Sequence, residues 1–363
     1  MQLYTVWNLH ELHPNEFNFS GILDLSQFLQ DIKDADIFEI VRPGPYICSE
    51  WEFGGLPSWL LRDKDMKVRS NYSPFLNATE NYLKKITEVI KSHQFSTNGG
   101  PIIAVQIENE FASFGNTKAH NSDQQYLTFL KNTLTNYGIK ELVFTSDNNL
   151  ILFQKNGNIP GVLIALNSAN PKELETLNKI QPNSAQYIAE FWTGSAYRYG
   201  DKYHERDNNS ENSYRNSYET AVIHYNASVN IYMFSGGTNF GFMNGANLIY
   251  TKPLRYHSYV ASYSHDAPLS EAGDYTQSYW STKQVIEKLA KERNFPKLKI
   301  PEPPKENLKA SYGTIKVLEY LTLNDLLKLI KPIASDLPKH MEMIDIKPNY
   351  GQNFGFTVYS EVI

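Results

Sequence analysis

Two kinds of apolar pattern alternate along the chain. Short continuous apolar runs are typical of strands that are buried on both faces of a parallel sheet. Spacings of three and four residues between the runs are typical of helices with one buried face. The predicted strands are residues 4–7, 38–41, 101–107, 142–145, 162–165, 185–192 and 229–234. The first predicted helical faces comprise Ile22, Leu25, Phe28, Leu29 and Ile32; Tyr82, Leu83, Ile86, Val89 and Ile90; and Tyr126, Leu127, Leu130 and Leu134.

Further helices are predicted at residues 221–225, 279–291 and 321–330, and the polar stretch 207–216 is predicted to be an exposed loop. Repeated strand–helix units predict a parallel sheet, either doubly wound or closed into a barrel. Seven predicted strands are one short of the eight of a closed (β/α)8 TIM barrel.

The chain divides by composition into three parts. Residues 1–293 carry the strand–helix units and are predicted to be an incomplete barrel domain. Pro296, Pro301, Pro303 and Pro304 indicate a stiff linker, which with the short helix covers residues 294–345. Residues 346–363 contain a strand-like run at 353–359, and we expect them to begin a β-domain that is cut short.

Composition excludes several classes of protein. The chain has 363 residues and a net charge of −5, and it has no basic run, which argues against a nucleic-acid partner. No apolar stretch is long enough to span a membrane. Cys48 is the only cysteine, so no internal disulfide is possible.

Signals for cellular location point in two directions. The first residues lack the charged start and apolar core of a signal peptide. Five Asn-x-Ser/Thr triplets nevertheless favour the secretory pathway. These triplets begin at Asn18, Asn71, Asn77, Asn208 and Asn226.

Two glutamates follow or lie in apolar strand runs, and they are the main candidates for chemistry. Glu110 closes the run that begins at Pro101, and Glu190 lies in the run 185–192. Barrel enzymes keep their active sites at the C-terminal ends of the strands, and two carboxylates that face each other across a sugar perform glycoside hydrolysis. From the pattern alone, the alternative that each Glu is an ordinary strand-end carboxylate stays open.

Three other motifs are set aside. The sequence His10-Glu11-Leu12-His13 is one residue short of the zinc-binding pattern H-E-x-x-H, and Pro14 disfavours a helix there. The glycine-rich residues 236–241 lack the Lys-Ser/Thr of a phosphate-binding loop. For Cys48, a small buried thiol is favoured over a protease nucleophile.

Taken together, the motifs resemble glycoside hydrolase family 35, the acid β-galactosidases of the lysosome and extracellular space. The resemblance extends over nearly the whole chain, from Tyr4 to Tyr359. It rests on residues 7–11 (Trp-Asn-Leu-His-Glu), 42–48 (Arg-Pro-Gly-Pro-Tyr-Ile-Cys), 50–52 (Glu-Trp-Glu), 54–61 (Gly-Gly-Leu-Pro-Ser-Trp-Leu-Leu), 106–110 (Gln-Ile-Glu-Asn-Glu), 230–234 (Asn-Ile-Tyr-Met-Phe), 236–240 (Gly-Gly-Thr-Asn-Phe) and 269–274 (Leu-Ser-Glu-Ala-Gly-Asp).

The resemblance implies a TIM barrel and retaining, exo-acting hydrolysis of terminal β-D-galactosyl residues from glycans. It makes Glu110 the acid/base and Glu190 the nucleophile, and it implies neither a metal nor an organic cofactor. It implies lysosomal or extracellular location and gives no oligomeric state. It places galactose contacts at Ile47, Cys48, Ser49, Glu50, Asn109, Trp192, Tyr232, Tyr263 and His265. The alternatives are core packing for Trp192 and Tyr232, and a structural ion pair with Arg42 for Glu50.

The sequence departs from the family pattern at four places. The first strand of the family, which carries a sugar-contacting Tyr, is absent before Met1, and the C-terminal β-domains are cut short. Ser195 stands where the family has Trp, and His265 stands where a sugar-contacting Tyr is expected. Two rival interpretations therefore stay open: a catalytically weak or inactive galactose-binding relative, and a non-functional fragment truncated at both ends.

Overall fold

The structure is a computed structural model of the chain. It describes residues 1–114, 124–148, 157, 159–194, 196–201, 207–249, 255–262, 266–294, 300–306, 308–346 and 350–360.

Seven parallel strands form one curved sheet with the spatial order β1 to β7, the same as the order along the chain. This order and direction are those of a nearly closed (β/α)8 barrel, so the predicted TIM-barrel class is confirmed. Within the described residues, β1 and β7 each pair with a strand on one side only. The strands are β1 Gln2–Tyr4, β2 Glu39–Arg42, β3 Ile102–Gln106, β4 Leu142–Asp147, β5 Leu163–Leu166, β6 Tyr187–Trp192 and β7 Ser228–Tyr232.

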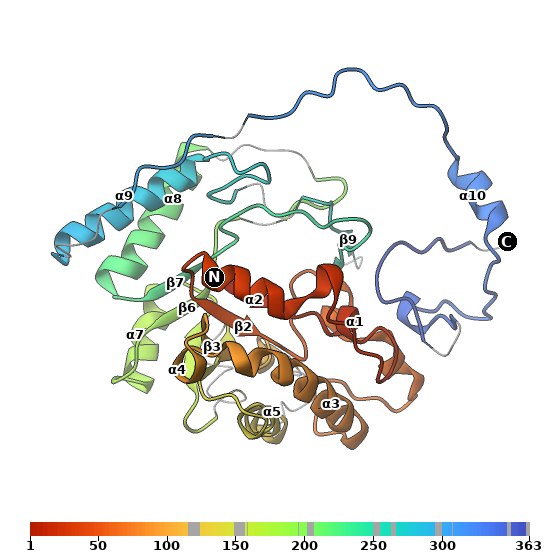
Figure 1. Cartoon of the computed structure of the whole chain (residues 1–363), viewed down its shortest axis with the longest axis horizontal. Coiled ribbons are helices and arrows are strands. Elements are labelled where there is room, and N and C mark those ends of the chain that lie inside the picture. Colours follow the sequence, from red (N-terminus) through yellow and green to blue (C-terminus); the bar gives the residue numbers. More distant parts are fainter. Residues whose placement is uncertain are drawn as a thin grey trace.

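Helices alternate with the strands and flank the sheet (Figure 1). They place every strand's C-terminal end at the same end of the barrel, because each strand–helix unit returns the chain to the start of the next strand. A short antiparallel pair, β8 Ala246–Ile249 and β9 Arg255–Ser258, follows β7. The helices are α1 Trp7–His10, α2 Leu25–Asp34, α3 Ser73–Ile90, α4 Phe95–Asn98, α5 Gln124–Asn136, α7 Pro171–Ile180, α8 Asn208–Glu219, α9 Gln277–Glu292 and α10 Leu323–Leu329.

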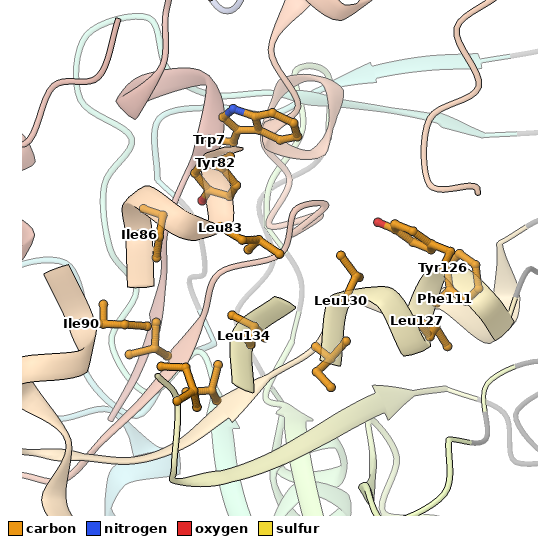
Figure 2. Close-up of a cluster of buried hydrophobic side chains, with 14 of the residues drawn as sticks. Trp7, Tyr82, Leu83, Ile86, Ile90, Phe111, Tyr126, Leu127, Leu130 and Leu134 are labelled. Atoms are coloured by element: carbon orange, nitrogen blue, oxygen red, sulfur yellow. The ribbon is translucent and has the colours of Figure 1, made fainter. Parts of the chain in front are cut away.

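The largest apolar core lies between helices α3 and α5 and the strands that they cover. Side chains of α3 and α5 point toward each other in Figure 2. Their apolar faces are the ones that the sequence predicts, since α3 buries Tyr82, Leu83 and Ile86, and α5 buries Leu127 and Leu130. The ring of Trp7 stacks on that of Tyr82, with centroids 4.7 Å apart, and extends this core to the N-terminal helix.

Three local predictions are wrong. The first strand ends at Tyr4, and Trp7 begins α1 instead of lying in a strand. Ile22 is exposed because it lies in a short turn before α2, so only Leu25, Leu29 and Ile32 of the predicted face are buried. Residues 353–359 form no strand.

The predicted loop 207–216 is also wrong, because most of it lies in α8. The carboxylate of Asp207 caps this helix by accepting a hydrogen bond from the backbone N–H of Ser210. Tyr214 and Tyr218 provide the buried face of this helix. The many Asn, Ser and Glu residues around them make the segment polar on average, which is why its composition predicted a loop.

After α9 the chain leaves the barrel and arcs across to α10 on the far side of the molecule (Figure 1). The predicted short helix within 321–330 is therefore confirmed as α10. Many large apolar side chains in 308–337 are exposed. The domain boundaries at residues 293 and 345 stay a prediction. Of the helices that the structure describes, none has an apolar stretch long enough to cross a membrane.

Candidate active site

Each of the seven strands, or the turn that follows it, contributes a polar side chain to one end of the barrel. The backbone dictates this placement, because parallel strands in sequential order bring all their C-terminal ends to the same rim. The contributing residues, in strand order, are Tyr4, Glu50, Glu110, Asp147, Asn167, Glu190 and Tyr232.

Glu190 is held in β6 by three neighbours and is 7% exposed. The guanidinium of Arg42 lies 2.7 Å from its Oε1 atom, and the Tyr4 hydroxyl donates to the same oxygen at 3.3 Å. The indole N–H of Trp192 donates to Oε2 at 3.1 Å. The buried cation of Arg42 compensates a negative charge on Glu190, so this carboxylate is both oriented and electrostatically balanced.

Glu110 lies four residues beyond the end of β3 in a left-handed backbone conformation, with φ of 49°. Its backbone N–H donates to Ser146 at 3.0 Å, and the Asn167 amide donates to its Oε1 at 2.7 Å. Burial raises the pKa of Glu110, and the negative charge of Glu190 raises it further. These causes favour a protonated carboxyl close to a second, ion-paired one.

Glu50 lies in a turn after β2 in which three consecutive residues, Cys48, Ser49 and Glu50, adopt left-handed backbone angles. Burial and the charge of Glu190 raise the pKa of Glu50 to about 7. The Tyr232 hydroxyl donates to its Oε2 at 3.2 Å. Arg42 forms its ion pair with Glu190 and not with Glu50. The carboxylate of Glu50 is instead held by the Tyr232 hydroxyl at this rim.

The remaining predicted contacts in this turn differ in exposure. Ile47 is buried, and its backbone N–H donates to Gly54 at 2.9 Å to close the turn. Cys48 and Ser49 are half-buried, and burial raises the pKa of the Cys48 thiol to about 11. Cys48 is therefore a protonated thiol at the rim, whereas the sequence predicts a buried one.

Asn109 is buried beside Glu110 and accepts a hydrogen bond from Arg42. A second buried arginine holds its backbone, because Arg69 donates to the Asn109 carbonyl at 2.6 Å and pairs with Glu108 at 2.7 Å. The turn before Glu110 is therefore anchored to a buried ion pair outside the rim itself.

The two predicted aromatic contacts both reach the rim. Trp192 is 52% exposed, which rules out full core packing for its ring. The ring of Tyr232 meets that of Tyr4 edge-on, with centroids 6.2 Å apart. Tyr263, His265 and Ser195 lie outside the described residues.

Tyr4, Asp147 and Asn167 have no predicted role in the sequence analysis, and Arg42 enters it only as the alternative partner of Glu50. Tyr4 and Arg42 contact Glu190, and Asn167 contacts Glu110. One signal could have identified Arg42 and Asn167, since each is a polar residue shortly after an apolar strand run. Tyr4 begins the predicted run 4–7 and became a strand-end residue only in the structure.

Comparisons of the sequence with known proteins give one family and many relatives. The family model described as glycosyl hydrolases family 35 matches residues 1–289. The human protein "Beta-galactosidase-1-like protein 2" is 37% identical over 368 residues, covering 99% of this chain and 54% of that protein. The bovine "Beta-galactosidase" is 33% identical over 373 residues, covering 100% of this chain and 52% of that protein. The chain therefore spans about half the length of the curated relatives it matches.

Solved structures support the barrel architecture alone. Xylanase 10B from Thermotoga maritima superposes with a TM-score of 0.51 at 14% identity, covering 80% of this chain and 88% of that chain. The GH5_18 protein from Streptomyces cattleya, in complex with GlcNAc, has a TM-score of 0.53 at 8% identity, covering 83% and 73%.

Proposed function

Because the chain belongs to glycosyl hydrolases family 35, we propose that it removes terminal β-D-galactosyl residues from glycans with retention of configuration. Glu110 is the acid/base and Glu190 the nucleophile in this proposal. Hydrolysis with retention needs one carboxyl that gives a proton to the leaving oxygen and one carboxylate that attacks the anomeric carbon.

The observation that carries the proposal is the unequal environment of the two carboxyls. Burial and the charge of Glu190 raise the pKa of Glu110, which suits a proton donor. Glu190 instead faces the buried guanidinium of Arg42 at 2.7 Å, which suits an ionised nucleophile.

The sugar contacts belong to the same proposal. Glu50 and Asn109 offer groups that can bond ring hydroxyls, while Trp192 and Tyr232 offer ring faces and polar atoms at the rim. Ile47, Cys48 and Ser49 form the turn that presents Glu50. Tyr263 and His265 stay predicted contacts.

Chemical rescue separates the two roles. With a β-galactoside that has a good leaving group, Glu110→Gly is expected to form the glycosyl-enzyme, and added azide is expected to yield the β-glycosyl azide because azide needs no general base. Glu190→Gly is expected to lose hydrolysis without azide restoring the retained β-product. The same rescue product from both variants would refute the assignment of roles, and absence of turnover by the unmodified chain would refute the activity.

We propose a secretory location on separate grounds. The five asparagines of the Asn-x-Ser/Thr triplets are all exposed in the structure. Expression in secretory cells followed by enzymatic removal of N-glycans is expected to lower the mass of the protein. An unchanged mass would contradict the proposed location in lysosome or extracellular space.

A further inference from the structure

The chain returns to the barrel after its long excursion through α10. We call residues 341–346 and 350–356 the return segment. Between it and the barrel, all residues of 310–340 except the half-buried Asp325 are exposed, so the intervening chain does not hold the return segment in place. Its position therefore depends on its own contacts with the barrel.

Those contacts concentrate on the short helical turn Ser58–Arg62. The backbone N–H of Ser58 donates to the side-chain oxygen of Asn353 at 2.7 Å, and its hydroxyl donates to the Gly351 carbonyl at 2.8 Å. Arg62 donates to the Glu342 carbonyl at 2.8 Å and pairs with Asp345 at 2.6 Å. Ser58 is fully buried and Asn353 is 5% exposed, so water cannot readily replace these bonds.

The same contacts reach the turn that carries Glu50. We call residues 47–56 the Glu50 loop. Buried Asn8 lies 3.4 Å from the Asn353 carbonyl, and it also approaches the carbonyls of Glu52 and Leu56 at 3.5 Å. The indole N–H of Trp51 donates to the Asn8 side-chain oxygen at 3.0 Å. Asn8 thus connects the return segment with the Glu50 loop.

Backbone hydrogen bonds close the Glu50 loop on itself, such as Ile47 N–H to Gly54 at 2.9 Å, and Gly245 donates to the Glu50 carbonyl at 3.1 Å. The backbone of the loop is nevertheless unusual. Left-handed angles at Cys48, Ser49, Glu50 and Phe53 are unfavourable for residues with a Cβ atom and persist only where the surroundings enforce them. Beside Gly245, the return segment is part of those surroundings, because Asn353 bonds Ser58, which follows the loop, and Asn8, which contacts it.

We propose that the return segment is a positioning element for the Glu50 loop. Its docking through Asn353 keeps the loop in the conformation that aims Glu50 into the site. Loss of the docking loosens the loop and weakens substrate binding while leaving Glu110 and Glu190 in place. The ordering of the loop does not depend on the proposed hydrolysis. The effect on substrate binding does rest on that proposed function.

The test compares Asn353→Ala with Gln352→Ala in the full chain. Both changes truncate an amide in the return segment. Among the residues that the structure describes, however, the side chain of Gln352 bonds to Phe356 and Thr357, within the same C-terminal stretch. Amide hydrogen exchange is measured across the chain, and KM and kcat are measured on a chromogenic β-galactoside.

Asn353→Ala is expected to accelerate exchange at residues 51–58 by about tenfold, and to raise KM several-fold with little change in kcat. Gln352→Ala is expected to match the parent chain in both measurements. Unchanged exchange at 51–58 in Asn353→Ala, or acceleration spread evenly over the barrel strands, would overturn the proposal. A fall in kcat at constant KM would do the same.

A second variant applies if Asn353→Ala does not fold. Arg62→Met removes the contacts to Glu342 and Asp345 at a partly exposed position. It is expected to accelerate amide exchange at the same residues by a smaller factor. Unchanged exchange there would overturn the proposal. If the parent chain shows no turnover, the proposed hydrolysis fails, and the exchange results alone decide whether the return segment orders the loop.

Discussion

At the level of single residues, the side chain of Arg42 on β2 contacts groups from three other strands or the turns after them. Its guanidinium is 1% exposed and contacts Glu190 on β6, Asn109 after β3, and Tyr4 on β1. A buried cation with several acceptors fixes the direction of each of them, since moving any one leaves a charge or a polar atom without compensation.

The two glutamates are expected to have opposite effects on stability. Glu190→Gln removes the carboxylate that pairs with buried Arg42, and it is expected to lower the free energy of unfolding by about 3 kcal/mol. Glu110→Gln is the matched control, because it keeps a side-chain oxygen for Asn167 and removes a carboxyl whose pKa is raised in the fold.

The direction of the stability change in Glu110→Gln follows from the linkage between protonation and folding. A carboxyl whose pKa is raised in the fold opposes folding once the pH rises above its unfolded pKa. Glu110→Gln is therefore expected to leave stability at neutral pH unchanged or higher. Urea unfolding of both variants measures the difference, and equal losses would contradict the asymmetry between the two sites.

Removal of the Asn167 amide is expected to move the pH profile of activity upward. Activity needs protonated Glu110, so it falls as the pH rises through the pKa of that carboxyl. The Asn167 amide donates to the carboxylate and lowers this pKa, so Asn167→Ala raises it. The measurement is kcat/KM against pH, with Asn136→Ala on the exposed end of α5 as control. A downward shift of the alkaline limb would contradict Glu110 as the proton donor.

At the level of elements, α8 and α9 form a helix pair that depends on a few buried polar bonds. Tyr214 and Thr282 share a hydrogen bond of 2.6 Å, and Ser278 donates to Glu211 at 2.9 Å. The helices lie side by side at one edge of the barrel in Figure 1. This pairing explains how a segment rich in Asn, Ser and Glu becomes a helix, since its few apolar and aromatic positions all face α9 or β6.

Tyr214→Phe tests that pairing. It removes the hydroxyl without a cavity and is expected to cost about 1 kcal/mol of unfolding free energy, whereas Tyr214→Ala also removes the ring that packs on Phe191 and is expected to cost about 3–5 kcal/mol. Tyr312→Phe, at a position that is 82% exposed, serves as control. Equal losses for Phe and Ala at position 214 would mean that the ring contributes no packing energy.

At the level of the whole molecule, a compact barrel carries a long exposed connection. Residues 308–340 include five lysines among exposed apolar side chains. This segment runs outside the barrel and contains α10 (Figure 1). The free energy of local opening is smallest where few groups are buried.

Limited trypsin digestion is therefore expected to cut first within residues 305–340. The barrel lysines on α3 are protected by the helix and serve as internal controls. The return segment is expected to stay bound to the nicked barrel, because its contacts to Ser58 and Arg62 do not pass through the linker. Early cleavage in α3, or release of the C-terminal peptide on gel filtration, would contradict this picture.

The sequence predicted the elements best where the apolar pattern is dense. The faces of α3 and α5 and the central strands follow from spacing alone, because burial of these positions is the dominant contribution to folding. The prediction failed in α8, where two tyrosines carry the burial, and at residues 353–359, where an extended strand-like run docks through side-chain bonds and joins no sheet.

The amino-acid sequence by itself determined the strand–helix order and the candidacy of Glu110 and Glu190. The order left a doubly wound sheet and a barrel both open, and the family resemblance favoured the barrel. Local spacing and residue type are sufficient for these, since each element selects its own buried face. Only the tertiary structure decided that Arg42 pairs with Glu190, that Asn167 reaches Glu110, and that Asn353 meets Ser58. The residues of the last two pairs are 57 and 295 positions apart in the sequence. No local pattern encodes such a contact, because it forms only when the whole chain closes around the barrel.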